Sequence, residues 1–273
     1  TEALRSILPL CDEVVVAVGN SGDGTRELVT SIDPRKIKVI DTSWDESLRE
    51  GGRVLAMETN KAFKAITADT DWCFYIQGDE VLHEDGYEEI EKAMRTWKDH
   101  KEVDGLLFKY RHFYGSFDYV GVSSKWYKRE IRIIKNDQRI YSYKDAQGFR
   151  KGNNEKLRVK PLNAFIHHYG WVREPDVMHS KQYDFGKLYH GEEWNSDEIK
   201  KIYSGDFDYS QIDALEKFNG THPKVMQPRI DRVNWTFDYD PSHNKLKPKE
   251  RFKNFIERLT GSRPFDHNNY KII

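Results

Sequence analysis

Asp79 and Glu80 are well placed for chemistry, because they follow the apolar run of residues 72–76 in the sequence Gln77-Gly78-Asp79-Glu80. The run predicts a buried strand, and open parallel sheets bind ligands beyond the carboxyl ends of their strands. A carboxylate there can bind Mg²⁺ or Mn²⁺ together with two diphosphate oxygens, and the cation offsets charge on a departing group. The alternative is structural: Asp79 or Glu80 caps a following helix.

A second polar turn, GNSGDGT at residues 19–25, follows the β-branched run of residues 14–18. Backbone N–H groups where such a turn opens a helix can face an anion or a nucleoside. This makes Gly19, Asn20 and Asp23 candidate substrate-binding residues. The turn lacks the lysine of a P-loop and the spacing of a GxGxxG fingerprint. A structural turn, in which Asp23 or Thr25 caps the helix, is the alternative.

Aromatic residues concentrate at residues 112–128, a segment predicted to be a long functional loop. The flat apolar faces of sugars favour aromatic platforms, so Tyr114 and Trp126 are candidates for binding an acceptor sugar. Packing into a satellite core is the alternative, because aromatic side chains are usually buried. In the predicted strand of residues 164–168, alternation places His167 and His168 on opposite faces, so one of them can face a site.

The elements that must position these residues alternate regularly in the first half of the chain. Strands are predicted at residues 14–18, 37–40 and 72–76, each followed by a helix. This order implies an α/β domain with a mostly parallel sheet covered on both faces. Further strands are predicted at residues 105–110, 131–134 and 164–168, and a helical pattern is predicted from Glu174 onward.

Composition and charge exclude several function classes. The 273 residues carry 44 basic and 45 acidic side chains, so the formal net charge of -1 offers no overall field for nucleic acid. No apolar stretch reaches about 18 residues, and therefore no transmembrane segment is expected. The two cysteines, Cys11 and Cys73, lack the spacing of a zinc site. They are expected to be buried reduced thiols, which favours a cytoplasmic location.

Three motifs in order resemble those of the family 2 glycosyltransferases, which have the GT-A fold. The strand–turn–helix motif is VGNSGDGT at residues 18–25, and a basic, glycine-containing loop at residues 49–53 precedes a helix with Asn60. The third motif is the strand that Asp71 opens and that ends at Gln77-Gly78-Asp79-Glu80. The resemblance covers residues 1–110 and is looser beyond them.

This resemblance implies a GT-A-like three-layer sandwich at residues 1–172 that binds a nucleotide sugar, and a helical C-terminal extension at residues 173–273. It implies inverting transfer of a sugar from a nucleoside diphosphate donor to a hydroxyl of a glycan or lipid-linked glycan. The implied role is bacterial surface polysaccharide or lipopolysaccharide synthesis. The implied location is the cytoplasm, with peripheral association at the inner face of the membrane as a further expectation.

The resemblance also assigns roles to single residues. Asp145 lies after the strand where the family places its general base, with Asp118 and Glu130 as substitutes. A plain turn aspartate is the alternative for Asp145. Arg53 is expected to contact the diphosphate from its loop, and His168 is expected to lie near the metal or the diphosphate.

Departures from the family pattern leave other functions open. The first Asp of the metal motif is Gln77 here, so only Asp79 keeps its carboxylate as a metal ligand beside His168. Gln77 is instead expected to hydrogen-bond a ribose or sugar hydroxyl, with Glu80 beside it. Val18-Gly19 replaces an acidic pair, and the family's first strand has no counterpart before Thr1. A catalytically inactive glycan- or nucleotide-binding relative and a nucleotidyltransferase are the alternatives.

Overall fold

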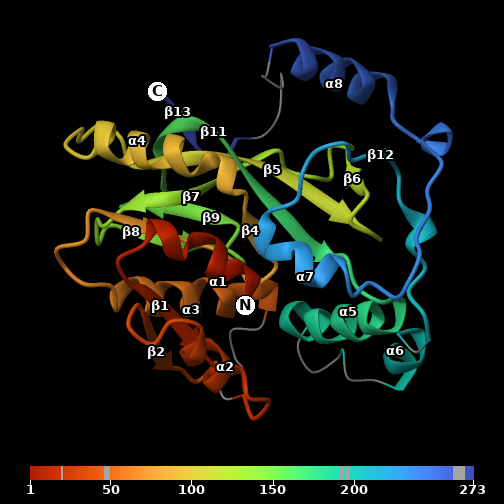
Figure 1. Cartoon of the computed structure of the whole chain (residues 1–273), viewed down its shortest axis with the longest axis horizontal. Coiled ribbons are helices and arrows are strands. Elements are labelled where there is room, and N and C mark those ends of the chain that lie inside the picture. The colour runs from red at the N-terminus through yellow and green to blue at the C-terminus, as the bar shows by residue number, and fades with distance from the viewer. Residues whose placement is uncertain (20, 46–49, 191–193, 195–196, 204, 261–267) are drawn as a thin grey trace.

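The chain folds into a mixed α/β structure in the computed structural model, which describes residues 1–273 except 20, 46–49, 191–193, 195–196, 204 and 261–267 (Figure 1). This confirms the expected fold class in its coarse form. The N-terminal elements are α1 (Glu2–Ile7), β1 (Val14–Val18), α2 (Thr25–Ile32), β2 (Ile37–Asp41) and α3 (Arg53–Lys64). The continuous β-branched run of β1 pairs in parallel with β2, from Val14↔Ile37 to Val18↔Asp41.

The main sheet is mixed, with parallel and antiparallel pairs. Its longest strands are β5 (Gly105–Tyr114) and β11 (Arg158–Trp171), which run parallel. The other edge of β5 pairs antiparallel with β7 (Arg129–Lys135), which pairs in turn with β3 (Trp72–Phe74). The antiparallel partners β4 (Glu80–Leu82) and β6 (Tyr119–Gly121) join β11 and β5, respectively.

Both faces of this sheet are covered. Leu106 and Phe108 lie on one face with Ile90 of α4 (Tyr87–Trp97), and Leu107 lies on the other face with Phe63 of α3. Alternation along β5 produces this division, because neighbouring side chains of a strand point to opposite faces. The strands are therefore held between two apolar layers, as the sequence pattern predicts.

A β-hairpin lies beside the main sheet and carries Asp145 at its tip. Its strands are β8 (Ile140–Tyr143) and β9 (Gly148–Lys151), and β10 (Glu155–Lys156) adds to β9. The turn between β8 and β9 places Lys144 at φ 54° and Ala146 at φ 61°. These left-handed conformations are uncommon for residues with a Cβ, so the hairpin tip has a defined and strained shape.

The C-terminal part combines helices with strands. Its helices are α5 (Pro175–His190), α6 (Asp197–Ile202), α7 (Gln227–Ile230) and α8 (Pro248–Thr260). β12 (Leu215–Lys217) pairs with β6, and β13 (Lys271–Ile272) pairs with β11. The extension is thus tied into the main sheet by backbone pairing as well as by helices. None of the described helices has the length and apolar character needed to cross a membrane.

A gap separates β1 from β3. In the described part of the chain β1 pairs only with β2, and β3 pairs only with β7. The other edges of both strands face an internal cavity, which α1 and α3 also line. The sheet of β1 and β2 is therefore joined to the main sheet by side-chain packing and not by a continuous backbone ladder.

The segment after Asp79 differs from the prediction. Neither Asp79 nor Glu80 caps a helix, because residues 80–82 form β4 and pair with residues 166–168 of β11. The following turn is capped by His83, whose side chain accepts a hydrogen bond from the N–H of Asp85, and α4 begins only at Tyr87. The capping alternative for the acidic pair is therefore wrong.

Candidate functional site

A cavity of about 1830 Å³ extends from the gap between β1 and β3 to the carboxyl end of β3. Its inner part is apolar and is lined by β1, β3, α1 and α3. This part is the gap between β1 and β3 that was described above. Its outer part is polar and holds the candidate site, at the strand end where α/β sheets bind ligands. The residues of this outer part include Gln77, Asp79, His112, Trp126, Glu130, Asp145, His168, Lys181 and Tyr189.

Asp79 is held between a lysine and a histidine. The ammonium of Lys181, on α5, donates a hydrogen bond to Oδ2 at 3.1 Å and another to the carbonyl of Gly170 at 2.7 Å. The Nε2 atom of His168 lies 3.7 Å from the same carboxylate oxygen. Burial alone would raise the pKa of Asp79, but His168 and Lys181 outweigh it and hold that pKa well below its ordinary value. Asp79 is therefore an ionised, paired carboxylate.

His168 and His112 form a hydrogen-bonded pair whose protons can be assigned. His112 Nε2 lies 2.8 Å from the carbonyl oxygen of Tyr127, so Nε2 carries the proton. Burial and the charge of His168 lower the pKa of His112 well below its usual range, so its Nδ1 is unprotonated. His168 must then donate from Nδ1 across the 3.2 Å that separates the two Nδ1 atoms. As predicted, His167 lies on the opposite face, fully buried against Arg111.

Asp145 lines the cavity from the hairpin tip and keeps one oxygen free of protein partners. Tyr189 of α5 donates a hydrogen bond to Oδ2 at 2.8 Å, whereas Oδ1 is buried without a hydrogen-bond partner in the described structure. Asn60 of α3 holds the hairpin, because it accepts from the N–H of Ser142 at 2.7 Å and donates to its carbonyl at 3.4 Å. This oxygen can accept a hydrogen bond from a water molecule or from a ligand, since buried polar atoms are normally satisfied.

Glu130 is a second carboxyl group that lines the cavity. Its side chain is buried on β7, and Oε1 accepts a hydrogen bond from the N–H of Ile131 at 3.0 Å. Burial raises the pKa of Glu130 to about 7, although Arg132 opposes the effect. A carboxyl group that titrates near neutral pH is suited to proton transfer. Glu130 was a substitute for Asp145 on sequence grounds, and its burial is the feature that the sequence did not show.

Glu80 does not lie in the site, which corrects the expectation that it binds substrate. Its side chain is fully buried, and Arg132 donates to both carboxylate oxygens, at 2.6 and 2.9 Å. Tyr110 and the N–H of Gln77 complete its hydrogen bonds. Glu80 therefore fixes the turn that presents Gln77 and Asp79. Gln77 faces the cavity and donates to the hydroxyl of Tyr75 at 3.1 Å.

The described residues of the turn at positions 19–25 do not line the cavity. Asp23 is exposed, and its Oδ1 accepts hydrogen bonds from Ser21 at 2.5 Å and from the N–H of Thr25 at 3.0 Å, at the start of α2. These bonds lower its pKa to about 2. Asp23 therefore has a structural role beside the first turn of α2, although the N-cap residue is Gly24 and no side chain caps the helix. Gly19 packs beside Trp44 and does not line the cavity, and Asn20 is outside the described residues.

Arg53 is exposed at the first turn of α3 and does not line the cavity, so the structure does not bring it to Asp79.

The two aromatic candidates, Tyr114 and Trp126, differ from each other in their environment. Tyr114 is only 4% exposed and packs in a cluster with Tyr119 and Tyr209, so the core-packing alternative holds for it. Trp126 lines the cavity, and its Nε1 is buried without a hydrogen-bond partner among the described residues.

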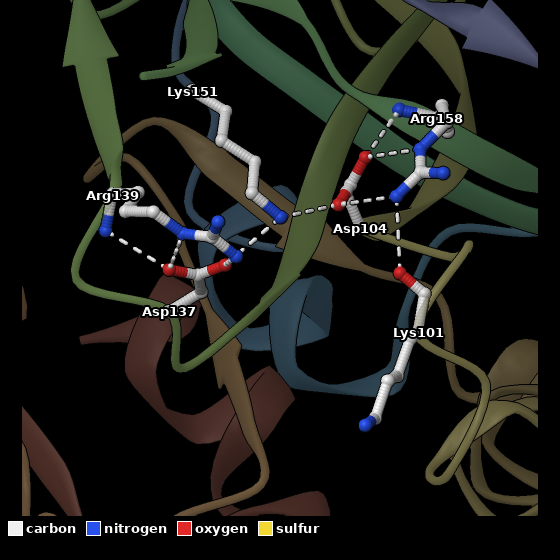
Figure 2. Close-up of polar contacts among 6 residues, drawn as sticks. All are labelled: Lys101, Asp104, Asp137, Arg139, Lys151 and Arg158. Carbon is white, nitrogen blue, oxygen red and sulfur yellow. Dashed lines mark hydrogen bonds and ion pairs between the residues drawn. The ribbon is translucent and has the colours of Figure 1, made fainter.

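Lys151 is engaged elsewhere, in an ionic network at the far end of β9. Figure 2 shows its ammonium between Asp104 and Asp137, at 2.8 Å from each. Arg158 and Arg139 pair with the same two carboxylates, at 3.1 and 2.7 Å. Because these charges satisfy one another, Lys151 has a structural role. This network joins β9 to β11 and supports the hairpin from the side opposite its tip.

The residues around Asp79 do not fit a divalent cation. Asp79 is the carboxylate there, and the Lys181 ammonium lies within hydrogen-bond distance of it, where a metal would need the same oxygen. His168 uses Nδ1 to reach His112 and turns Nε2 towards Asp79. Within the described residues, no three His, Cys, Asp or Glu side chains are grouped as metal ligands. The expected Mg²⁺ or Mn²⁺ site is therefore not supported by this donor set.

Sequence reasoning missed Lys181 and Tyr189, which bind Asp79 and Asp145 from α5. Their only sequence signal is a helical spacing, since residues 181, 182, 185 and 189 all line the cavity.

A scan against models of protein families found no match for this chain. A search of curated proteins likewise found no similar sequence.

Proposed function

We propose that this chain is a glycosyltransferase that moves a sugar from a nucleoside diphosphate donor to an acceptor hydroxyl with inversion. The observation that carries the proposal is the free Oδ1 of Asp145 in the same cavity as the Asp79–Lys181 pair. Asp145 Oδ1 can accept the proton of a hydroxyl, and the ammonium of Lys181 can bind a diphosphate. The order of the sequence motifs supports the same assignment.

Helix α5 sets the spacing of these two parts. Lys181 and Tyr189 lie eight positions apart in one helix, which corresponds to about 12 Å along its axis. Lys181 holds Asp79 at one end, and Tyr189 holds Asp145 at the other. A diphosphate bound near Lys181 and a sugar reaching towards Asp145 would occupy the space between them.

In the proposed reaction Asp145 Oδ1 accepts the proton of the acceptor hydroxyl. At the same time, the oxygen of that hydroxyl attacks the anomeric carbon of the donor sugar. The bond from that carbon to the diphosphate oxygen breaks, and the electron pair leaves with the diphosphate. Lys181 and His168 stabilise the charge that develops there. Trp126 lines the cavity and offers its ring to a sugar. The acceptor would be a glycan or lipid-linked glycan of a bacterial surface polysaccharide or lipopolysaccharide, handled in the cytoplasm.

The test is transfer and donor hydrolysis by the purified chain across UDP, GDP and dTDP sugars. Asp145→Asn should lower kcat at least about 100-fold, which is the usual contribution of a general base. Asp118→Asn is the matched control, because Asp118 is exposed and does not line the cavity. If Glu130→Gln is inactive and Asp145→Asn is not, the base is Glu130.

Calorimetry with the free nucleotides separates the alternatives. Nucleotide binding without any turnover would favour an inactive relative, and it would contradict the catalytic assignment. Absence of binding to UDP, GDP and dTDP alike would contradict the glycosyltransferase proposal as a whole. Turnover that produces pyrophosphate from a nucleoside triphosphate would indicate a nucleotidyltransferase.

A further inference from the structure

The C-terminal helix α8 turns a polar face towards the protein and an apolar face towards solvent, whereas an ordinary surface helix does the reverse. Its polar residues Glu250 and Asn254 face the body of the protein. Glu250 Oε1 accepts hydrogen bonds from the N–H and the hydroxyl of Ser124, at 3.0 and 2.6 Å. Asn254 Nδ2 donates to the carbonyl of Val122 at 3.1 Å. The side of α8 that contacts the protein is thus bound by polar contacts.

Three large apolar residues of α8 point away from the protein. Phe252, Phe255 and Leu259 are 57%, 58% and 68% exposed. Their spacing places them on one stripe of the helix, about 180° from the stripe of Glu250 and Asn254. Figure 1 shows α8 at the outer edge of the molecule. An exposed stripe of large apolar side chains marks an interaction site when it is contiguous.

The charges around this stripe identify the kind of partner. The exposed charged side chains described in residues 241–260 are all basic, namely Lys245, Lys247, Lys249 and Arg251. Lys249 and Arg251 flank the apolar stripe on either side of the helix. A chain of net charge -1 therefore carries a local cationic surface around an apolar stripe. A second copy of the same helix would bring these cations together, so the charges disfavour a symmetric dimer.

We propose that α8 binds the surface of an anionic lipid bilayer, with its axis parallel to the membrane and Phe252, Phe255 and Leu259 inserted. Apolar insertion flanked by lysine and arginine is the signature of interfacial helices. The helix of 13 residues is about 20 Å long, which suits the interface. This proposal does not depend on glycosyl transfer.

The contact of α8 with the loop of residues 122–126 gives the binding an orientation. Ser124 bonds to Glu250, and the next two residues, Lys125 and Trp126, line the cavity. A bilayer under α8 would therefore lie close to the Trp126 side of the cavity. A lipid-linked substrate could then reach the cavity without leaving the membrane surface.

Flotation of the purified 273-residue chain with vesicles tests the proposal. One vesicle set is phosphatidylcholine alone, and the other contains about 30% phosphatidylglycerol, because anionic lipid attracts polybasic segments. We expect binding to the anionic vesicles at least about tenfold stronger than to the neutral ones, with weakening as salt rises. Phe252→Ser/Phe255→Ser should lower binding at least about tenfold. Lys247→Gln/Lys249→Gln/Arg251→Gln should abolish the preference for anionic lipid.

Leu28→Ser is the matched control, because Leu28 of α2 is 53% exposed and lies outside α8. It should bind vesicles as the wild type does, and circular dichroism should show all variants folded. Equal binding to both vesicle types, or unchanged binding of the double phenylalanine variant, would overturn the proposal. So would sedimentation showing a dimer that the phenylalanine variant dissociates, because the stripe would then be a protein interface.

Discussion

The ammonium of Lys181 donates a hydrogen bond of 3.1 Å to Asp79 Oδ2, across 102 positions of sequence. The same ammonium binds the carbonyl of Gly170, next to the end of β11. One side chain of α5 therefore fixes the carboxylate that follows β3. It also places a positive charge at the strand end where the motifs predict a diphosphate.

Removal of metal should leave nucleotide affinity unchanged, because the Lys181 ammonium binds the Asp79 oxygen that a metal ion would need. For the proposed nucleotide ligand, we expect the Kd to change less than about twofold when Mn²⁺ is replaced by EDTA. Lys181→Met should weaken binding about 10- to 100-fold, the range for a lost hydrogen bond to a charged group. Lys187→Met on the same helix is the control, since Lys187 pairs with Asp184 and does not line the cavity. A strong requirement of the wild type for Mn²⁺ in calorimetry would contradict this prediction.

The stability of the fold should fall with rising pH near neutrality because of Glu130. Its pKa is about 7 in the folded state, against an ordinary value of 4.5. The protonated form is therefore favoured by folding, and its contribution is fully present below pH 4.5 and lost as the pH rises through 7. The full shift corresponds to about 3 kcal/mol. Glu130→Gln should flatten the change in unfolding free energy between pH 5 and 8, as measured by urea titration at about six pH values. An unchanged slope in the variant would show that another group is responsible.

The buried pair of Glu80 and Arg132 should be far more sensitive than a surface pair. Glu80→Ala leaves the Arg132 guanidinium buried without its partner, so we expect a loss of about 3–5 kcal/mol in unfolding free energy. Glu91→Ala removes a surface pair with Arg95 and should cost less than about 1 kcal/mol. Denaturant unfolding at pH 7 measures both. Equal losses for the two variants would mean that Glu80 is not a structural residue.

Gly52 should be required for the position of Asp145. Its φ is +69°, and an added Cβ would lie 2.8 Å from the Cβ of Asp145. Gly52→Ala should therefore displace the hairpin tip and cost about 1–3 kcal/mol of stability. Gly22→Ala is the matched control, because its Cβ would meet no atom within 4 Å. Thermal unfolding and turnover of the two variants compare the effects, and equal results would contradict the role of Gly52.

The sequence was a reliable guide where apolar runs are long. The strand predicted at residues 14–18 coincides with β1, and the helix predicted to contain Asn60 is α3. Such segments carry their own signal, because β-branched runs and helical periodicity determine them locally. β4 was missed, since its three residues form a strand only through their pairing with β11.

The site was predictable only in part, because long-range contacts also determine which side chains form it. Asp79 was singled out because it follows a predicted strand, whereas Asp145 and His168 were chosen through the family resemblance. Glu80 has the same sequence context as Asp79, yet it is buried against Arg132, which is 52 positions away. Lys181 and Tyr189 lie in a helix without a motif, and their roles come from residues that the fold brings to them. Long-range pairing therefore decided which polar residues face the cavity.

The gap between β1 and β3 has a consequence for cooperativity. No backbone ladder crosses it in the described structure, so β1, β2 and α2 are connected to the rest of the protein by side-chain packing and by side-chain hydrogen bonds, such as that from Lys38 to the carbonyl of Ala65. A unit joined in this way opens locally at a lower free energy than the ladders of β5 and β11. The amide hydrogens of β1 should consequently exchange with solvent well before those of β5, and unfolding should proceed in two stages. The polar site stands on the more stable of these two units.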